Sequence, residues 1–130
     1  MSAVIYCLLA GIGLIYLAKL PLAWAMQQEA GGYDNHHPRQ QQARLAGFGA
    51  RALAAHQNSI EAFPLFAVGV LLSLHAGVGH ALILQLSLLH LLARALYLLC
   101  YWFDWAWQRS LVWLLGLFSS LALLVAPLTL

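Results

Sequence analysis

Three side chains that could bind a charged ligand interrupt an apolar stretch of the chain. Arg51, Asn58 and Glu61 stand in the sequence RALAAHQNSIEAFP, which ends at Pro64, and no further charged residue follows as far as Leu74. Charged groups inside hydrocarbon are costly, so they usually face a bundle interior or a wet cavity. The stretch therefore predicts a ligand site on a membrane-spanning helix.

The helical spacing of these residues puts them on one side of that helix. At about 100° per residue, Asn58 lies about 20° from Arg51, and Glu61 lies about 80° from it. A guanidinium binds a carboxylate through a planar fork, a carboxylate accepts hydrogen bonds from an ammonium, and an amide can orient peptide groups. This chemistry suits a small zwitterionic, peptide-like ligand.

A second polar stripe follows in the next apolar segment, where Ser87, His90, Arg94, Tyr97 and Tyr101 recur every three or four residues. Their spacing places them on one helix face. We expect Arg94, Tyr97 and Tyr101 to address the same site as the first set. For His90 we expect a hydrogen bond to another helix. The histidines, cysteines and carboxylates form no convergent ligand set, so the sequence predicts no metal site.

The composition identifies an integral membrane protein. The chain has 130 residues, of which 63% are hydrophobic and 8% are charged. Because one span needs about 20 residues, the length allows roughly four helices in a single all-α transmembrane domain. We expect these helices at about residues 3–26, 43–74, 81–103 and 109–127. The net charge of +2 is far from the dense basic surface of a nucleic-acid-binding protein, and no such partner is expected.

The basic residues predict the orientation of the helices. Arg39 and Arg44 lie in or beside the polar first loop, Arg109 follows the third helix, and the second loop contains neither lysine nor arginine. The positive-inside rule therefore puts loops one and three in the cytoplasm and both termini outside. Gly or Ala at positions 46, 50, 54 and 62 would let the second helix approach its neighbours closely.

Arg109 and Ser110 begin the fourth predicted helix. Free backbone N–H groups and the helix dipole favour an anion at such a position, and a thiolate would be stabilised there. Two alternatives stay open. Arg109 and Ser110 could instead mark the headgroup level and cap the helix, and Arg51, Glu61 and Arg94 could form interhelical ion pairs.

Taken together, these segments resemble the MAPEG family, the membrane-associated proteins in eicosanoid and glutathione metabolism. The resemblance is carried by AHQNSIEAFPLF after Arg51, by RALYLLCY from Arg94 to Tyr101, and by YDNHHPR and ARLAGFGARA, which are similar to the bacterial members. It implies a four-helix protomer, a homotrimer with the second helices near its axis, and glutathione bound between protomers.

The resemblance also implies roles for individual residues. Asn58 and Glu61 match the family's glutathione-contacting asparagine and glutamate, and Arg51 matches an arginine of the same helix. Arg94 and Tyr101 match an arginine and a tyrosine of the third helix.

Two further residues match family positions near the glutathione sulfur, and two others depart from the family pattern. Arg109 and Ser110 resemble the arginine and serine near the glutathione sulfur, and Tyr97 occupies a position that can be histidine. Gln57 and Ala54 stand where several family enzymes have basic residues, which predicts weaker carboxylate binding.

The resemblance predicts a glutathione-binding protein of the bacterial inner membrane. It would be of transferase or peroxidase type and act on lipophilic electrophiles or hydroperoxides, with glutathione as co-substrate. Its partners would be its own copies in a homotrimer and membrane lipids. The alternative is a non-enzymatic trimeric membrane protein that binds lipid or another anionic metabolite, so the sequence leaves enzymatic activity open.

Overall fold

The computed structural model describes residues 1–130, and all its regular elements are helical. Four of the helices are long and apolar enough to cross a membrane. The helices are α1 (Ser2–Gln28), α2 (Pro38–Arg44), α3 (Phe48–His75), α4 (His80–Trp102) and α5 (Ala106–Val125), followed by the 3₁₀ helix η1 (Ala126–Thr129). The protein is an all-α integral membrane four-helix bundle with a short additional helix in its first loop.

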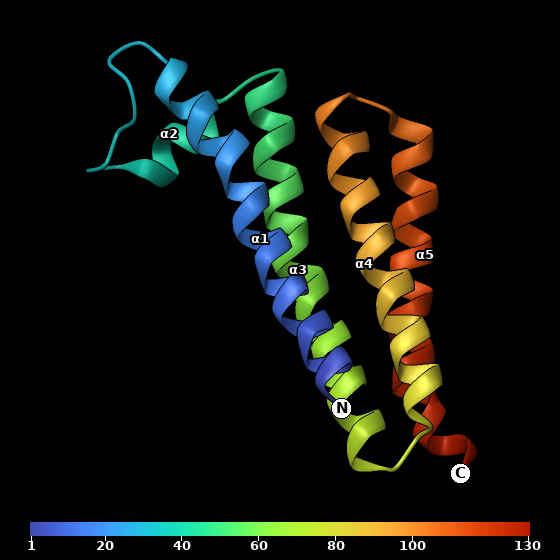
Figure 1. The fold of residues 1–130 in the computed structure, drawn as a ribbon. Helices are drawn as coiled ribbons and strands as arrows, with labels where there is room; N and C mark the ends of the chain where they lie inside the picture. Colours follow the sequence, from blue (N-terminus) through green and yellow to red (C-terminus); the bar gives the residue numbers. More distant parts are fainter.

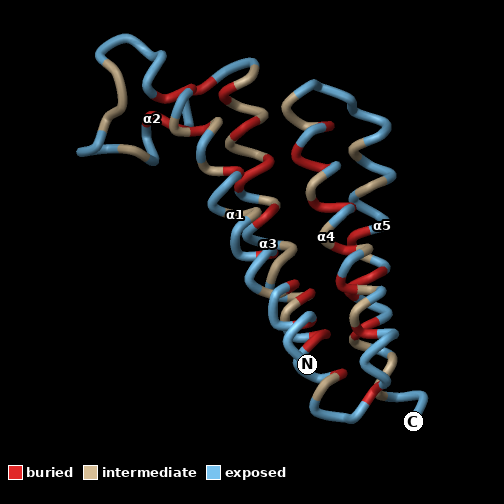
Figure 2. The backbone as a smooth tube through the Cα atoms, in the orientation of Figure 1, coloured by how far each residue is buried: buried red, intermediate tan, exposed pale blue.

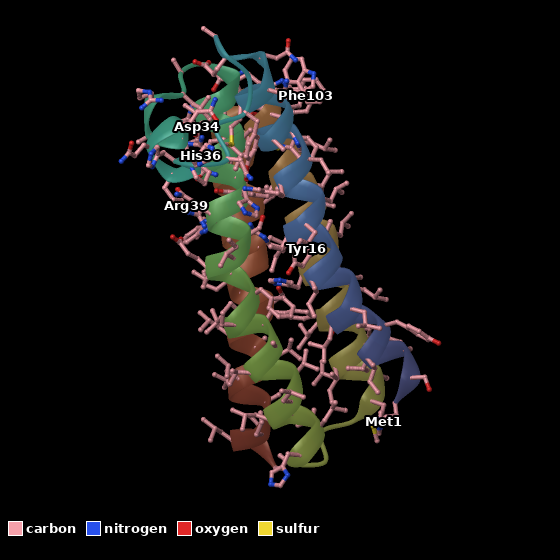
Figure 3. The ribbon with its side chains drawn as sticks, turned by 90° about the vertical axis from the view of Figure 1, so that its left-hand side faces the viewer. Met1, Tyr16, Asp34, His36, Arg39 and Phe103 are labelled. Atoms are coloured by element: carbon pink, nitrogen blue, oxygen red, sulfur yellow. The ribbon has the colours of Figure 1, made fainter.

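The long helices form two antiparallel pairs, α1 with α3 and α4 with α5 (Figure 1). The pairs converge at the end that carries both termini and the loop between α3 and α4, and they diverge toward the opposite end (Figure 1). Asp34, His36 and Arg39 of the first loop and Phe103 of the third gather at this opposite end, far from Met1 (Figure 3). We call the two ends the closed end and the open end.

The largest buried apolar cluster lies toward the closed end. Phe66 and Val70 of α3 are fully buried there and pack against residues of α1, α4 and α5. Gly69 allows α5 to approach, because a Cβ at this position would lie 2.9 Å from the Leu123 Cβ. Buried residues lie on the facing sides of the helices and exposed residues on the outside (Figure 2). The exposed residues include many large apolar side chains, as expected for a surface that faces lipid.

The first loop differs from its predicted form. The predicted second helix at residues 43–74 is interrupted at Leu45–Gly47, so α3 begins only at Phe48. The short helix α2 covers residues 38–42, which were predicted as loop, and the first two residues of the predicted second helix. Gly47 has φ 55°, a left-handed conformation that glycine adopts readily. Gln41 fastens α2 to α1, because its side-chain amide donates to the carbonyl oxygens of Met26 and Gly32 at 3.0 and 2.9 Å.

Candidate functional site

A cavity of about 160 Å³ lies between α3, α4 and α5. We call it the inner chamber. Its wall combines an amide, a carboxylate, a guanidinium, an imidazole and a hydroxyl with apolar side chains. The lining residues are Asn58, Glu61, Ala62, Leu65, His90, Arg94, Trp113, Gly116, Leu117 and Ser120. The structure thus brings together three of the predicted ligand-binding residues, which are Asn58, Glu61 and Arg94.

Arg94 is the buried cation of the inner chamber. Its side chain is only 5% exposed, and the centre of its guanidinium lies 4.3 Å from the ring centroid of Tyr97. One Nη donates to the Ser59 hydroxyl oxygen at 3.4 Å. A guanidinium has five N–H donors in a fixed fork, so this single long bond leaves most of its donor capacity for a carboxylate.

Asn58 and Glu61 supply the complementary groups from α3. The Asn58 Oδ1 is buried and has no hydrogen-bond partner within the protein. Such an atom is costly unless another molecule donates to it. The Glu61 side chain is exposed beside it at the rim of the chamber. An ammonium or amide N–H at this position would satisfy both groups.

His90 contacts α5 and is held in one orientation. Its Nδ1 lies 3.1 Å from the Gly116 carbonyl oxygen and 3.0 Å from the Ser120 hydroxyl oxygen. Because a carbonyl oxygen only accepts hydrogen bonds, the bond to Gly116 requires that Nδ1 carries the proton. The ring also stacks on Phe66 at a centroid distance of 4.1 Å and an angle of 7°. The bond from His90 on α4 to Gly116 on α5 confirms the predicted interhelical hydrogen bond.

A second cavity, of about 440 Å³, lies between α4 and α5 nearer to the open end. We call it the outer chamber, and its lining residues are Tyr97, Tyr101, Arg109, Ser110, Trp113 and Leu114. The rings of Tyr97 and Tyr101 pack edge to face at 5.5 Å. The centre of the Arg109 guanidinium lies 4.4 Å from the Tyr101 ring centroid. Two phenols, a cation and a hydroxyl are therefore grouped around one space.

The start of α5 corrects the prediction for Arg109 and Ser110. Because the helix begins at Ala106 and not at residue 109, the Arg109 N–H already donates to the Trp105 carbonyl oxygen at 2.9 Å. The Ser110 hydroxyl donates to the Ala106 carbonyl oxygen at 3.3 Å and does not cap the helix. Any anion here would thus be bound by the Arg109 side chain rather than by free backbone N–H groups at these two residues.

Arg51 lines neither chamber. Its guanidinium centre lies 5.9 Å from the Phe48 ring centroid, and its buried Nε has no partner. Within this chain, Arg51, Glu61 and Arg94 do not form the interhelical ion pairs that were left open. Arg94 instead donates to Ser59, and Arg51 packs on an aromatic ring. Gln57, which the resemblance placed at a position that is basic in several family enzymes, is exposed and also lies outside both chambers.

Most of the chamber-lining residues that the sequence reasoning missed lie on α5. Trp113, Gly116 and Ser120 line the inner chamber, although only Arg109 and Ser110 of this helix were predicted to take part in a site. Their spacing could have identified them, because residues three or four positions apart lie on the same helix face. From Ser110, steps of this size lead through Trp113 and Leu117 to Ser120.

Four apolar spans with two polar cavities between the last three of them define an integral membrane protein that can bind a ligand within its helices. The family comparison agrees with this description. The MAPEG family model matches residues 3–129, and the chain therefore belongs to the MAPEG family. No curated protein and no solved structure matches the chain.

Proposed function

We propose that this protein is a glutathione-dependent transferase or peroxidase of the membrane. It would act on lipophilic electrophiles or hydroperoxides that enter from the bilayer, with glutathione as co-substrate. The observation that carries the proposal is the inner chamber, which offers a carboxylate, a buried guanidinium and an unpaired amide oxygen around one space.

These three groups match the α-amino acid end of glutathione. The Arg94 fork would bind the α-carboxylate of the γ-glutamyl residue, because guanidinium and carboxylate form two parallel hydrogen bonds. The Glu61 carboxylate and the Asn58 Oδ1 would accept hydrogen bonds from the α-ammonium. Both charges at this end of the ligand would then be paired, as burial of charges within a membrane protein requires.

The outer chamber would hold the sulfur. The Arg109 guanidinium would stabilise the thiolate, because a nearby cation lowers the pKa of a thiol. The Ser110 hydroxyl and the phenols of Tyr97 and Tyr101 could donate hydrogen bonds to the sulfur or orient the peptide. Trp113 lines both chambers, so one tripeptide could reach from Glu61 to Arg109.

The chemistry of both activities is balanced without a further cofactor. In the transferase reaction, the thiolate attacks an electrophilic carbon, a carbon–sulfur bond forms, and the leaving group departs with its electron pair. The thiol proton passes to water. In the peroxidase reaction, two molecules of glutathione supply two electrons and two protons, and the products are an alcohol, water and glutathione disulfide.

Arg51 supports a homotrimeric form of this proposal. It lies near the open end of α3 with a buried Nε that has no partner in its own chain. In a trimer with the α3 helices near the axis, Arg51 would contribute to the site of a neighbouring protomer.

We further propose that the open end, which carries the first and third loops, faces the cytoplasm of a bacterial inner membrane, where glutathione would be available.

The alternative function is binding of lipid or another anionic metabolite without turnover. It is favoured by the size of the outer chamber and by its apolar wall of Trp113 and Leu114, both of which are partly exposed to the surroundings. A phospholipid or fatty acid could place its chain along this wall and its anionic head near Arg109.

Glutathione titration of Arg94→Gln distinguishes these functions. In the purified protein, glutathione should produce thiolate absorbance, and conjugation of 1-chloro-2,4-dinitrobenzene should follow. Arg94→Gln should weaken glutathione binding at least about tenfold, because a hydrogen bond to a charged group contributes about 1.5–3 kcal/mol. Arg44→Gln is the matched control, since Arg44 is exposed on α2. Absence of glutathione binding at millimolar concentration, together with co-purified lipid, would overturn the proposal and support the alternative.

A further inference from the structure

Trp113 is the one residue that lines both the inner and the outer chamber. Helical spacing explains this position, because residues three or four positions apart lie on the same face. Toward the open end, the preceding turn of this face carries Arg109 and Ser110, which line only the outer chamber. In the other direction, the next turn carries Gly116 and Leu117, which line only the inner chamber. A ligand that extends between the chambers must therefore pass the Trp113 indole.

The outer chamber also carries aromatic rings on its α4 side. Tyr97 is buried there, and its ring centroid lies 4.3 Å from the centre of the Arg94 guanidinium and 5.5 Å from the Tyr101 ring centroid. These neighbours fix the ring in place. The chamber is thus bordered by an indole from α5 and by two phenols from α4, while Leu114 provides its aliphatic contact.

The exposure of Trp113 indicates where an acceptor would enter. Trp113 is 39% exposed and Leu114 is 40% exposed, so one side of the chamber opens to the surface of the bundle. Where no neighbouring protomer covers it, this part of the transmembrane helix α5 would face lipid. A hydrophobic molecule could pass from the bilayer along the indole to Arg109 and Ser110 without crossing water.

We propose that Trp113 is a specificity-determining residue that selects planar, electron-poor aromatic acceptors over flexible aliphatic ones. This inference rests on the proposed function and names its substrate class. An electron-poor ring stacks favourably on an electron-rich indole or phenol. A flexible alkyl chain gains no such stacking and loses conformational freedom when it is confined.

The reaction with such an acceptor is an aromatic substitution. The thiolate near Arg109 forms a bond to the ring carbon that carries a halide, and the carbon–halogen bond then breaks. The halide leaves with the bonding electron pair, and the thiol proton has already passed to water. No oxidant or reductant is needed. Trp113 takes part only by binding the ring and makes no bond to the reacting atoms.

Equilibrium binding of two glutathione conjugates tests the inference without requiring turnover. S-(2,4-dinitrophenyl)glutathione carries a planar electron-poor ring, and S-hexylglutathione carries a flexible chain on the same peptide. The wild-type protein should bind the dinitrophenyl conjugate more tightly. Trp113→Leu should reduce this preference about two- to tenfold, because an aromatic pair contributes about 0.5–1.5 kcal/mol beyond its buried area. Trp113→Phe should retain most of the preference.

Phe118→Leu provides a control on the same helix, since Phe118 is 60% exposed and lines neither chamber. The Phe118→Leu variant should prefer the dinitrophenyl conjugate as strongly as the wild type does. Thermal unfolding should show that all variants are folded. Equal binding of the two conjugates by the wild type, or equal weakening of both in Trp113→Leu, would overturn the inference while the proposed function stands. Failure of glutathione itself to bind would overturn both.

Discussion

Toward the closed end, the space between the helices is filled by Phe66, Val70 and Leu123, which are all fully buried. Toward the open end, the same helices enclose two cavities with charged and aromatic walls. The two regions also differ in their polar groups. The Ser73 hydroxyl donates across the closed end to the Leu123 carbonyl oxygen at 2.6 Å, whereas the Asn58 Oδ1 beside the inner chamber has no partner.

This difference separates stability from binding. Side chains at the closed end satisfy one another, so their removal leaves a cavity or an unpaired group. Side chains around the chambers keep donors and acceptors that the protein itself does not use, and such groups lower stability unless a ligand pairs with them. We therefore expect substitutions at the closed end to affect unfolding most, and substitutions around the chambers to affect ligand binding most.

The largest effect on stability is expected for Phe66→Ala. This ring is fully buried in the main apolar cluster and also stacks on His90. Its removal should lower the free energy of unfolding by about 3–5 kcal/mol, the usual cost of truncating a buried phenylalanine. Unfolding by SDS in mixed micelles measures this change. Phe118→Ala, on the exposed side of α5, is the control. A similar small effect of both variants would show that the closed end is not the stabilising region.

A smaller effect is expected for Gly69→Ala. The new Cβ would lie 2.9 Å from the Leu123 Cβ and 3.1 Å from the Ser120 carbonyl oxygen, so α3 and α5 would have to separate. Such overpacking costs about 1–3 kcal/mol.

Gly13→Ala is the matched comparison, because nothing lies within 4 Å of a Cβ at that position in α1. That substitution should be neutral or stabilise the protein by up to about 1 kcal/mol through its higher helix propensity. The same unfolding assay measures both variants. A Gly69→Ala protein as stable as Gly13→Ala would contradict the close packing of α3 against α5.

The membrane fold could be predicted from the sequence because its main constraint acts on composition. An apolar run long enough to span hydrocarbon must be helical, and the chain contains four such runs. The boundaries were less predictable. The pattern from 43 to 74 continues through Leu45–Gly47, where the backbone instead makes a left-handed turn at Gly47. Polar residues such as Gln41 can belong to a loop or to a short helix, and only their tertiary hydrogen bonds decide between these structures.

The candidate site was predictable where the residues share one helix face. Spacing alone placed Asn58 near Glu61 and Arg94 near Tyr97, and each of these residues lines one of the chambers. Spacing could not show that Arg94 and Tyr97 line different chambers, because this depends on how α5 packs against α4. It also could not identify Trp113, since a tryptophan in a membrane helix is equally typical of a lipid interface.

The smallest predicted effect concerns the first loop, which belongs to neither packed region. The Asp34 Oδ1 accepts hydrogen bonds from the N–H groups of His37 and His36 at 2.9 and 3.0 Å. These bonds hold the pKa of Asp34 below its usual range. Because the folded pKa is lowered, the stabilisation is present above the pKa of the unfolded chain and is lost as the pH falls through the folded value. The loop should therefore loosen below about pH 4.

Hydrogen exchange of residues 33–45 measures this loosening, after correction for the pH dependence of intrinsic exchange. Asp34→Ala should exchange faster at every pH, since it lacks the acceptor. Asp34→Asn keeps an acceptor oxygen but does not titrate. Exchange of the loop should therefore depend less on pH in Asp34→Asn than in the wild type. Unfolding of the whole protein should be the same in the wild type and in both variants, because Asp34 lies in the loop and outside the packed helices. Wild-type exchange that does not change on acidification would contradict this role of the Asp34 carboxylate.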